Sequence, residues 1–448
     1  MAEEFKDSTV WTGKTITKLI LLQKVSWWWR ADVLLTVILF SIVGSLKWRT
    51  NFLETDLTFG LTLGSTATIV ALFLLLQYWS VAFRKWVGYS LADYNTATHV
   101  MVYPRPHKGS TELLRLECDT NNSRESIKYF VFQKRRFQYS PLHRQFQKLK
   151  YPAEEPLEFY PSNKGFDSVE EAMERLKTYG ENRLEIPVPS FLDLYKEQLL
   201  APFFVFQVFC VLLWCLDQYW RYSVMTLVML LVFEATVANG RRKSLRELRG
   251  MKNRPYQLYV YRCRKWQETA STKIVPGDII SVTRSSEPDL VVPCDALVLN
   301  GSIVADESLL TGESIPVVKD ALSLVSETNP RRPLSMRGED KNSVIFGGTR
   351  TLQVVVSESF SLKAPDNGAI CYVLRTGFGS VQGKLMRTIL LSTEKVSANA
   401  KEAAFLILFL LFFALVSSAY VLKKGLESQE RNRFELLLHC ILIITSLL

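Results

Sequence analysis

Six apolar blocks, separated by long charged stretches, constrain the fold of this chain more than any other feature of its sequence. They cover residues 33–46, 59–83, 203–220, 222–237, 403–422 and 434–448. A helix needs about 20 apolar residues to cross a bilayer. The second and fifth blocks have this length, and the third and fourth are adjacent, which predicts a tight helical hairpin. We therefore predict a multi-pass α-helical membrane protein, in contact with the lipid bilayer, with sizeable domains outside it.

Basic residues beside these blocks predict the orientation. They precede the first block and follow the second and the fourth: Lys14, Lys18, Lys24, Arg30, Arg84, Lys85, Arg241, Arg242, Lys243, Arg246 and Arg249. Cytosolic flanks of membrane helices are enriched in Lys and Arg, so the N-terminus and residues 84–198 and 240–400 should be cytosolic. The loop after the fifth block departs from this rule, because Lys423 and Lys424 lie on the opposite side. Two glycosylation sequons, at Asn121 and Asn300, fall in the cytosolic segments and should carry no glycan.

The formal net charge of +10 raises the question of nucleic-acid binding. The basic residues gather at the ends of apolar blocks and are not interleaved with stacking aromatics, so we expect no nucleic-acid partner. The seven cysteines contain no Cys-x-x-Cys pair, and neither they nor the four histidines have the spacing of metal ligands. We therefore expect free thiols and no metal site.

Residues 84–198 have the pattern of a small α+β domain. Residues 127–139 predict a strand, a turn at KRR (residues 134–136) and a second strand. A helix is expected over residues 167–179, with Ser168 and Glu171 spaced as a capping box and Gly180 as its end. Ser190 should begin an amphipathic helix that leads into the third block. Nothing in this segment indicates chemistry, so we expect a structural or docking role.

Residues 240–400 have the pattern of a compact all-β domain. Strands are expected over residues 256–263, 279–282, 291–299, 344–356 and 370–375, with a turn at Pro276-Gly277-Asp278. Between them lies Thr311-Gly312-Glu313-Ser314. A glycine with free φ lets a loop tip turn sharply and approach another domain, and the neighbouring carboxylate could orient a water for attack on an acyl phosphate. The hydroxyls of Thr311 and Ser314 could fix that carboxylate.

The order of these motifs resembles the actuator domain of P-type ATPases. The resemblance rests on the Pro-Gly-Asp turn between strands, on Val292-Pro293-Cys294-Asp295, and on the run from Asp306 to Pro316. Most family members have a small residue, usually alanine, at the position of Cys294. Residues 202–217, 376–390 and 420–426 narrow the resemblance to the type V, subgroup A enzymes of the endoplasmic reticulum, and the two apolar blocks before the third also fit them.

The resemblance implies roles for the loop residues. Glu313 would orient the water that hydrolyses an aspartyl phosphate, and Thr311, Gly312 and Ser314 would shape the loop. The glycine-rich run before Lys384 resembles the segment that closes the actuator domain. It is not a nucleotide P-loop, because Leu385 stands where a Ser or Thr must hold magnesium.

The resemblance also implies a domain order. Residues 1–30 would be a cytosolic N-terminus, 31–83 two additional membrane helices, 84–198 the small α+β domain, 199–239 a membrane hairpin, 240–400 the actuator domain, and 401–448 a membrane helix with the start of the next. ATP and Mg²⁺ would bind outside this chain, because Asp-Lys-Thr-Gly-Thr is absent and Asp340-Lys341 continues with Asn342-Ser343. We expect the N-terminal portion of a longer pump of the endoplasmic reticulum membrane, inactive alone.

Two substrates are implied by the resemblance: mis-inserted transmembrane helices, or a divalent cation such as manganese. Glu234 is the only acid well inside an apolar block, and one carboxylate is a poor cation cage. The polypeptide substrate is therefore favoured. Glu234 lies close to the basic flank at Arg241, which indicates an interfacial position. A third alternative is a short membrane-anchored adaptor without catalysis.

Overall fold

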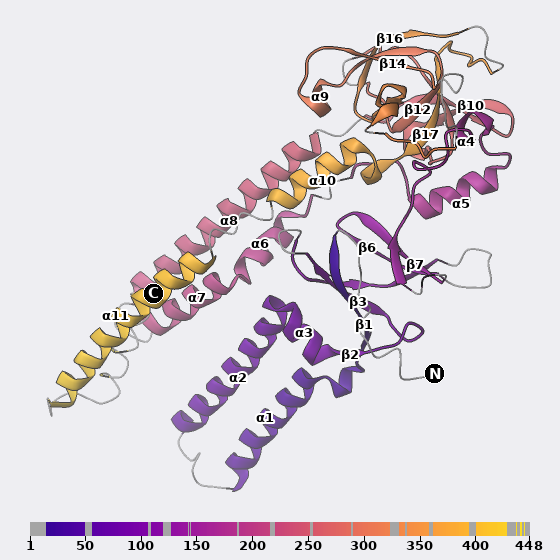
Figure 1. Cartoon of the computed structure of the whole chain (residues 1–448). Helices are drawn as coiled ribbons and strands as arrows, with labels where there is room; N and C mark the ends of the chain where they lie inside the picture. The colour runs from indigo at the N-terminus through magenta and orange to yellow at the C-terminus, as the bar shows by residue number, and fades with distance from the viewer. Residues whose placement is uncertain are drawn as a thin grey trace. The chain divides into compact units, whose positions relative to one another are not determined.

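The fold is taken from a computed structural model. It describes residues 15–49, 56–105, 109–119, 127–141, 143, 145–185, 188–215, 220–250, 254–287, 290–322, 331–336, 338–357, 362–393, 400–427, 436, 440 and 443. The chain forms two compact units (Figure 1). One comprises Met1–Lys24, Leu91–Glu185 and Met251–Thr393, and the other Val25–Ser90, Ile186–Gly250 and Glu394–Leu448. Each unit is thus assembled from segments that are distant in sequence.

The N-terminal part of the first unit consists of two four-stranded sheets, ordered β2-β1-β3-β4 and β5-β6-β7-β8. Four phenylalanines, Phe130, Phe132, Phe137 and Phe146, lie in one buried cluster with apolar residues of β1 and β3. The strands are β1 (Ile16–Lys24), β2 (Tyr89–Leu91), β3 (His99–Pro104), β4 (Glu112–Arg115), β5 (Glu117–Asp119), β6 (Ile127–Phe132), β7 (Arg135–Ser140) and β8 (Gln145–Lys148).

Strand β1 does not fit the expected separate N-terminal segment of residues 1–30. It pairs antiparallel with β3, from Ile16 opposite Pro104 to Leu22 opposite His99. Ile16 and Leu22 are fully buried, whereas Lys18 on the same strand is exposed. The basic residues assigned to a membrane flank therefore include the solvent side of a strand. Local periodicity cannot reveal such a pairing, because the two strands are separated by two apolar helices.

The hairpin of β6 and β7 forms where it was predicted, but its turn is shifted. The turn residues are Gln133 and Lys134, with φ of 49° and 58°. Two positive φ values give a turn that follows the right-handed twist of the strands. Arg135 and Arg136, which were assigned to the turn, consequently lie in β7.

The predicted helices of this region are confirmed. Helix α5 (Val169–Tyr179) begins at Ser168, whose hydroxyl accepts a hydrogen bond from the Glu171 N–H, and ends at Gly180 with φ of 78°. Helix α6 (Phe191–Leu199) begins at Ser190, which accepts from the Asp193 N–H. A short helix, α4 (Phe159–Ser162), precedes them, and single 3-10 turns lie at Trp27–Trp29, Ser271–Lys273, Glu339–Ser343 and Gly377–Gly379.

The rest of the first unit is built on a six-stranded sheet ordered β10-β9-β11-β17-β12-β15, beside a three-stranded sheet ordered β14-β13-β16. Along β12, Ala296 and Val298 join one buried cluster, and Leu297 and Leu299 join another. The central sheet is thus buried on both faces, which explains its continuous apolar runs. The strands are β9 (Gln257–Arg262), β10 (Lys265–Ala270), β11 (Ile279–Val282), β12 (Asp295–Asn300), β13 (Ser302–Asp306), β14 (Val317–Asp320), β15 (Val344–Ile345), β16 (Arg350–Val355) and β17 (Ala369–Arg375).

Several strand limits differ from those predicted. The run expected over residues 291–299 becomes extended strand only from Asp295, and the run expected over 344–356 is divided into β15 and β16. The division falls at Gly347 and Gly348, and Gly348 has a φ of 90°. Strands β10, β13 and β14 were not predicted, because polar residues interrupt the alternation of apolar and polar side chains in these short segments.

The expected boundary between the small α+β domain and the actuator domain also shifts. Ala153, Leu157 and Tyr160 lie in the same buried cluster as Tyr372 of β17. The rings of Tyr160 and Tyr372 are in edge contact, with centroids 5.3 Å apart. Residues expected in the domain of 84–198 therefore complete the core of the β domain.

The second unit is helical. Its helices are α1 (Ala31–Arg49), α2 (Asp56–Trp79), α3 (Val81–Gly88), α6, α7 (Pro202–Trp214), α8 (Trp220–Gly250) and α11 (Ala400–Glu427). Within the described residues, two helices are long and apolar enough to cross a membrane, over Thr62–Trp79 and Trp220–Glu247. The pair Phe191–Leu199 and Pro202–Leu212, bent by 64°, adds one broken span, and the apolar stretch Ala31–Ser45 is shorter. The sixth apolar block lies almost entirely outside the described residues.

Two helix limits in the second unit differ from expectation. Helix α7 ends at Trp214 instead of near residue 220. Helix α8 continues through the basic flank to Gly250, because its arginines and leucines favour helix and no proline interrupts them. Glu234 is consequently internal to a long helix.

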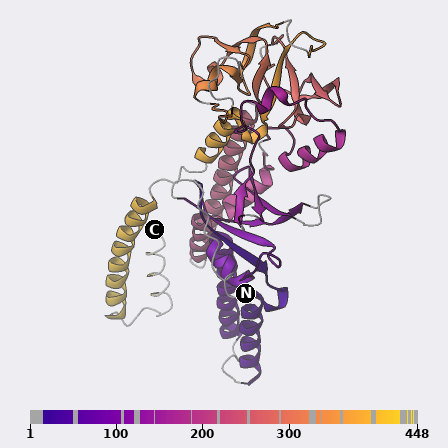
Figure 2. The ribbon, with the colours of Figure 1, turned by 45° about the vertical axis from the view of Figure 1, so that its right-hand side comes forward.

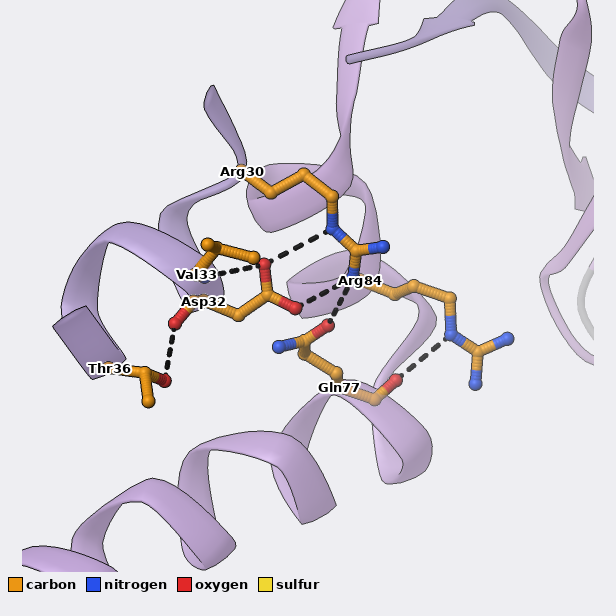
Figure 3. A network of polar contacts seen from close by, with 6 residues as sticks. All are labelled: Arg30, Asp32, Val33, Thr36, Gln77 and Arg84. Carbon is orange, nitrogen blue, oxygen red and sulfur yellow. Dashed lines mark hydrogen bonds and ion pairs between the residues drawn. The ribbon is translucent and has the colours of Figure 1, made fainter. Parts of the chain in front are cut away.

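A polar network joins the start of α1 to the end of α2 (Figure 3). The Arg30 guanidinium donates to both Asp32 carboxylate oxygens, at 3.1 and 2.7 Å, and to Gln77 Oε1 at 3.5 Å. Arg84 Nε donates to the Gln77 carbonyl oxygen at 3.0 Å. Helices α1 and α2 lie side by side in both ribbon views (Figures 1 and 2). The network brings Arg30 and Arg84, which the sequence assigns to one membrane face, to the same end of this pair.

Candidate functional site

The loop that carries Thr311-Gly312-Glu313-Ser314 is the tip of a hairpin. Strands β13 and β14 pair antiparallel, with Ala305 opposite Val317, and the intervening residues contain helix α9 (Ser308–Thr311). In Figure 1, α9 lies at the edge of the β domain, beyond the ends of its strands. The hairpin therefore presents the loop at the margin of the domain.

Hydrogen bonds within the loop fix its backbone. Gly312 ends α9 with φ of 79°, in the left-handed region, and its N–H donates to the Ser308 carbonyl. The Thr311 hydroxyl donates to the Glu307 carbonyl at 3.1 Å and accepts from the Glu313 N–H at 3.2 Å. Thr311 thus positions the backbone of Glu313, and no contact with its carboxylate is present among the described residues. No hydrogen bond of the Ser314 hydroxyl is present in the same part of the chain.

The tip of the loop is exposed. All four residues from Thr311 to Ser314 are exposed, and a Cβ at Gly312 would have no atom within 4 Å. The large apolar side chains on either side, Leu309 and Ile315, are 74% and 76% exposed. The structure therefore requires glycine at position 312 for its φ and not for space within this domain.

A buried ion pair supports the base of the loop. Lys319 Nζ lies 2.8 Å from Glu307 Oε1, and the two side chains are 0% and 3% exposed. Lys319 also donates to the Lys341 carbonyl at 3.1 Å and lies 5.2 Å from the ring centroid of Phe346. The pair ties the residue before α9 to β14. Sequence analysis missed Lys319, because nothing in the strand sequence Val-Val-Lys-Asp distinguishes a buried lysine from an exposed one.

A hydrogen bond at the base of the loop adds to the support given by the ion pair of Glu307 and Lys319. Asp306 Oδ1 accepts a hydrogen bond from the Ser308 N–H at 2.9 Å. Hydrogen bonding to Ser308, from its side chain first and from its backbone N–H second, lowers the pKa of Asp306. Asp306 thus fixes the backbone at Ser308, where α9 begins.

The Pro-Gly-Asp turn has a structural role. Gly277 has a φ of 107°, and Asp278 is fully buried. Both carboxylate oxygens of Asp278 accept from Arg262, at 2.7 and 2.6 Å, and one also accepts from the Val275 N–H. Burial raises the pKa of Asp278, and its pairing with Arg262 opposes this shift. The turn therefore joins β9 to β11 and contributes no group to the loop.

Asp295 anchors the segment that closes the domain. Its carboxylate accepts from the Gly347 N–H at 3.0 Å and from the Val381 N–H at the start of helix α10 (Val381–Thr393) at 3.0 Å. Complete burial raises the pKa of Asp295 to about 6. Cys294 beside it is also fully buried, and burial raises the pKa of its thiol well above the ordinary range. All seven cysteines are free thiols, and no group of three or more His, Cys, Asp or Glu in the described part of the chain is placed to hold a metal ion.

Family comparison identifies the β domain. Residues 252–390 match the model of the P-type ATPase actuator domain, and this range includes the loop, its supporting ion pair and the Asp295 anchor. The chain belongs to the P-type ATPase family. A second model, that of the cation transporter/ATPase N-terminus, matches residues 150–214. This range includes Tyr160, whose side chain is buried in the core of the actuator domain.

Individual relatives agree with this assignment. The chain is 42% identical to an endoplasmic reticulum transmembrane helix translocase of Aspergillus fumigatus, over 86% of this chain and 30% of that protein. It is 40% identical to a probable manganese-transporting ATPase of Arabidopsis thaliana, over 97% and 37%. It is also 40% identical to an endoplasmic reticulum transmembrane helix translocase of Schizosaccharomyces pombe, over 86% and 32%. The chain therefore spans about a third of the length of these relatives, and the resemblance to the type V, subgroup A enzymes is confirmed.

Proposed function

We propose that this chain supplies the membrane anchor and the actuator domain of an ATP-driven translocase that extracts mis-inserted transmembrane helices from the endoplasmic reticulum membrane. The observation that carries the proposal is the loop from Thr311 to Ser314, exposed at its tip and fixed at its base, within a domain that matches the actuator model. The names of two relatives, both endoplasmic reticulum transmembrane helix translocases, support the substrate class.

In this proposal Glu313 acts on water. Its backbone is held by Thr311, and its exposed side chain is free to reach a second domain. There the carboxylate orients a water for attack on the phosphorus of an aspartyl phosphate and accepts its proton, while the P–O bond to the aspartate breaks and inorganic phosphate is released. In the whole protein ATP would supply the phosphoryl group with the aid of Mg²⁺, and the aspartate would belong to a domain distinct from the matched actuator region. Gly312 adds no side chain at the tip, so the loop backbone can approach its target closely.

The proposed topology is multi-pass, with the N-terminus and actuator domain in the cytosol. Two described helices and one bent pair have the length and apolarity of spans, and the six apolar blocks of the sequence extend this pattern. The location of Arg30 and Arg84 at one end of the α1–α2 pair is consistent with a cytosolic end there.

Phosphoenzyme kinetics test the role of Glu313. In the full-length protein, Glu313→Gln should still form phosphoenzyme from radiolabelled ATP but should hydrolyse it about 100-fold more slowly, because general acid-base groups contribute about 10²–10⁴-fold. Glu287→Gln, at an exposed acid of the same domain, is the matched control. Decay of the Glu313→Gln phosphoenzyme at the native rate would show that another group activates the water.

Manganese transport is a second candidate, because one relative at 40% identity over 97% of this chain is named a probable manganese-transporting ATPase. Transport assays with the full-length protein in liposomes distinguish the translocase from the manganese transporter. ATP-dependent release of a mislocalised tail-anchored helix, without manganese uptake, supports the translocase. Manganese uptake with no effect on the helix would reverse the choice.

A further inference from the structure

A cationic pocket of about 350 Å³ lies within the first unit, away from the loop of Glu313. Its walls come from β7, β8, the end of α5 and the segment from Thr376 into α10. Eight lysines and arginines line it, against two glutamates, Glu117 and Glu181. The volume is within the range of small-ligand sites, and the imbalance of charge indicates an anionic ligand.

The two glutamates are engaged at the rim. Glu117 accepts a hydrogen bond from the Tyr129 hydroxyl at 2.6 Å. Glu181 pairs with Arg183 at 2.7 Å, where both side chains are more than 40% exposed. Neither glutamate therefore forms an ion pair with Arg135, Lys148 or Arg387.

Three cations of the lining, Arg135, Lys148 and Arg387, define the site. Arg387 is only 7% exposed, and its guanidinium donates to the Phe378 carbonyl at 3.4 Å. The Nε of Arg135 is buried without a hydrogen-bond partner in the described part of the chain. None of the three forms an ion pair with an acid of the described residues. A buried charge that no acid neutralises, such as the Arg387 guanidinium, is unfavourable for folding, so its presence beside two further cations needs another reason.

The positive charges of these three residues also repel one another. Partial desolvation, followed by repulsion from Arg135, Arg375 and Arg387, lowers the pKa of Lys148 to about 8. Burial, followed by repulsion from Arg135, lowers the pKa of Arg387 to about 10. An anion bound among them would reduce this repulsion and favour the charged form of each group.

The uncharged lining adds a donor. Burial raises the pKa of Tyr151 to about 12, so its phenol keeps its proton and can donate. Two guanidinium groups, one ammonium and a phenol present more donors than a single carboxylate can accept. They suit the oxygens of a phosphate, which arginine binds with two parallel hydrogen bonds.

We propose that this pocket binds a phosphate-bearing ligand through Arg135, Lys148 and Arg387. The proposal is independent of the proposed function, because no pocket residue belongs to the loop. The phosphate has two possible sources with the same chemistry, the headgroup of a membrane lipid and a soluble phosphomonoester. Bound phosphate would cross-link β7, β8 and α10, and so stabilise the unit.

Paired probes distinguish the two sources. Full-length protein is placed in phosphatidylcholine nanodiscs with or without phosphatidic acid, and glycerol 3-phosphate is added separately as the soluble form of the same group. We expect one of the probes to raise the melting temperature saturably, whereas chloride at equal ionic strength does not. A response to phosphatidic acid alone identifies a lipid headgroup, and a response to glycerol 3-phosphate identifies a soluble ligand.

Substitutions locate the binding to the pocket. Lys148→Gln and Arg135→Gln should each weaken binding of the active probe about tenfold or more, because each removes a charge-assisted hydrogen bond. Lys265→Gln, at an exposed lysine of β10, should have no effect. Lys148 is exposed, so its variant should fold. No response to either probe, or equal binding by Lys148→Gln, Arg135→Gln and Lys265→Gln, would overturn the proposal.

Discussion

Glu307 and Lys319 form an ion pair of 2.8 Å in which neither side chain is more than 3% exposed. Glu307 is the residue before α9, and Lys319 belongs to β14, so the pair closes the base of the hairpin whose tip carries Glu313. In the proposed function, this base supports the exposed tip from which Glu313 would reach another domain. The buried charge pair therefore links the stability of the domain to the geometry of its loop.

Removing one member of this pair should be more harmful than removing both. Glu307→Gln or Lys319→Met would leave a buried charge unpaired, which costs about 3–5 kcal/mol. The double variant should recover part of that loss. The matched control is the exposed pair of Arg264 and Asp167, 84% and 80% exposed, where single substitutions should change little. The check is the melting temperature of the purified chain; equal effects at both pairs would contradict the structural role of Glu307.

Gly312→Ala should separate loop function from domain stability. The strain of alanine in the left-handed region costs about 1 kcal/mol, and its Cβ meets no atom of the domain. The variant should keep most of its stability yet slow phosphoenzyme hydrolysis in the full-length protein. Gly383→Ala is the contrasting case, because its Cβ would overlap the backbone of Gly377 and Phe378. A loss of stability at Gly312→Ala as large as at Gly383→Ala would show that position 312 is packed.

Asp295 should make stability depend on pH in the acid range. Its pKa is about 6 in the folded domain and lower in the unfolded chain, so between about pH 4 and pH 6 the folded state binds a proton that the unfolded state has released. The contribution of Asp295 to the free energy of unfolding therefore falls as the pH rises through this window. Asp295→Asn lacks this titration. The melting temperature of the native chain, relative to that of Asp295→Asn, should be higher at pH 4.5 than at pH 7. A difference that is the same at both pH values would argue against the raised pKa.

Asn300 should carry no glycan. Its side chain is 4% exposed and donates to the Ser357 carbonyl at 3.3 Å, so a glycan there would prevent folding of the strand it ends. The proposed cytosolic placement of the actuator domain leads to the same expectation. The check is an endoglycosidase digest of the native chain beside Asn300→Gln. A mass shift that disappears in the variant would place this domain on the other side of the membrane. The sequon at Asn121 lies outside the described residues.

The sequence by itself determined the local elements. Ser168, Ser190 and Gly180 mark helix ends because a cap contacts backbone groups within four residues, and such contacts can be read from spacing alone. The apolar blocks and the order of motifs around Glu313 likewise sufficed to predict helices, an all-β domain and the actuator loop. These features depend on neighbours in the chain.

Only the tertiary structure decided which distant residues meet. Three features each join segments that no local pattern connects: the pairing of β1 with β3, the burial of Lys319 beside Glu307, and the pocket that Lys148 and Arg387 both line. A lysine in an alternating strand has the same sequence signature whether it faces water or an internal acid. Its environment is set by the sheet that packs over it, and that packing is a property of the whole fold.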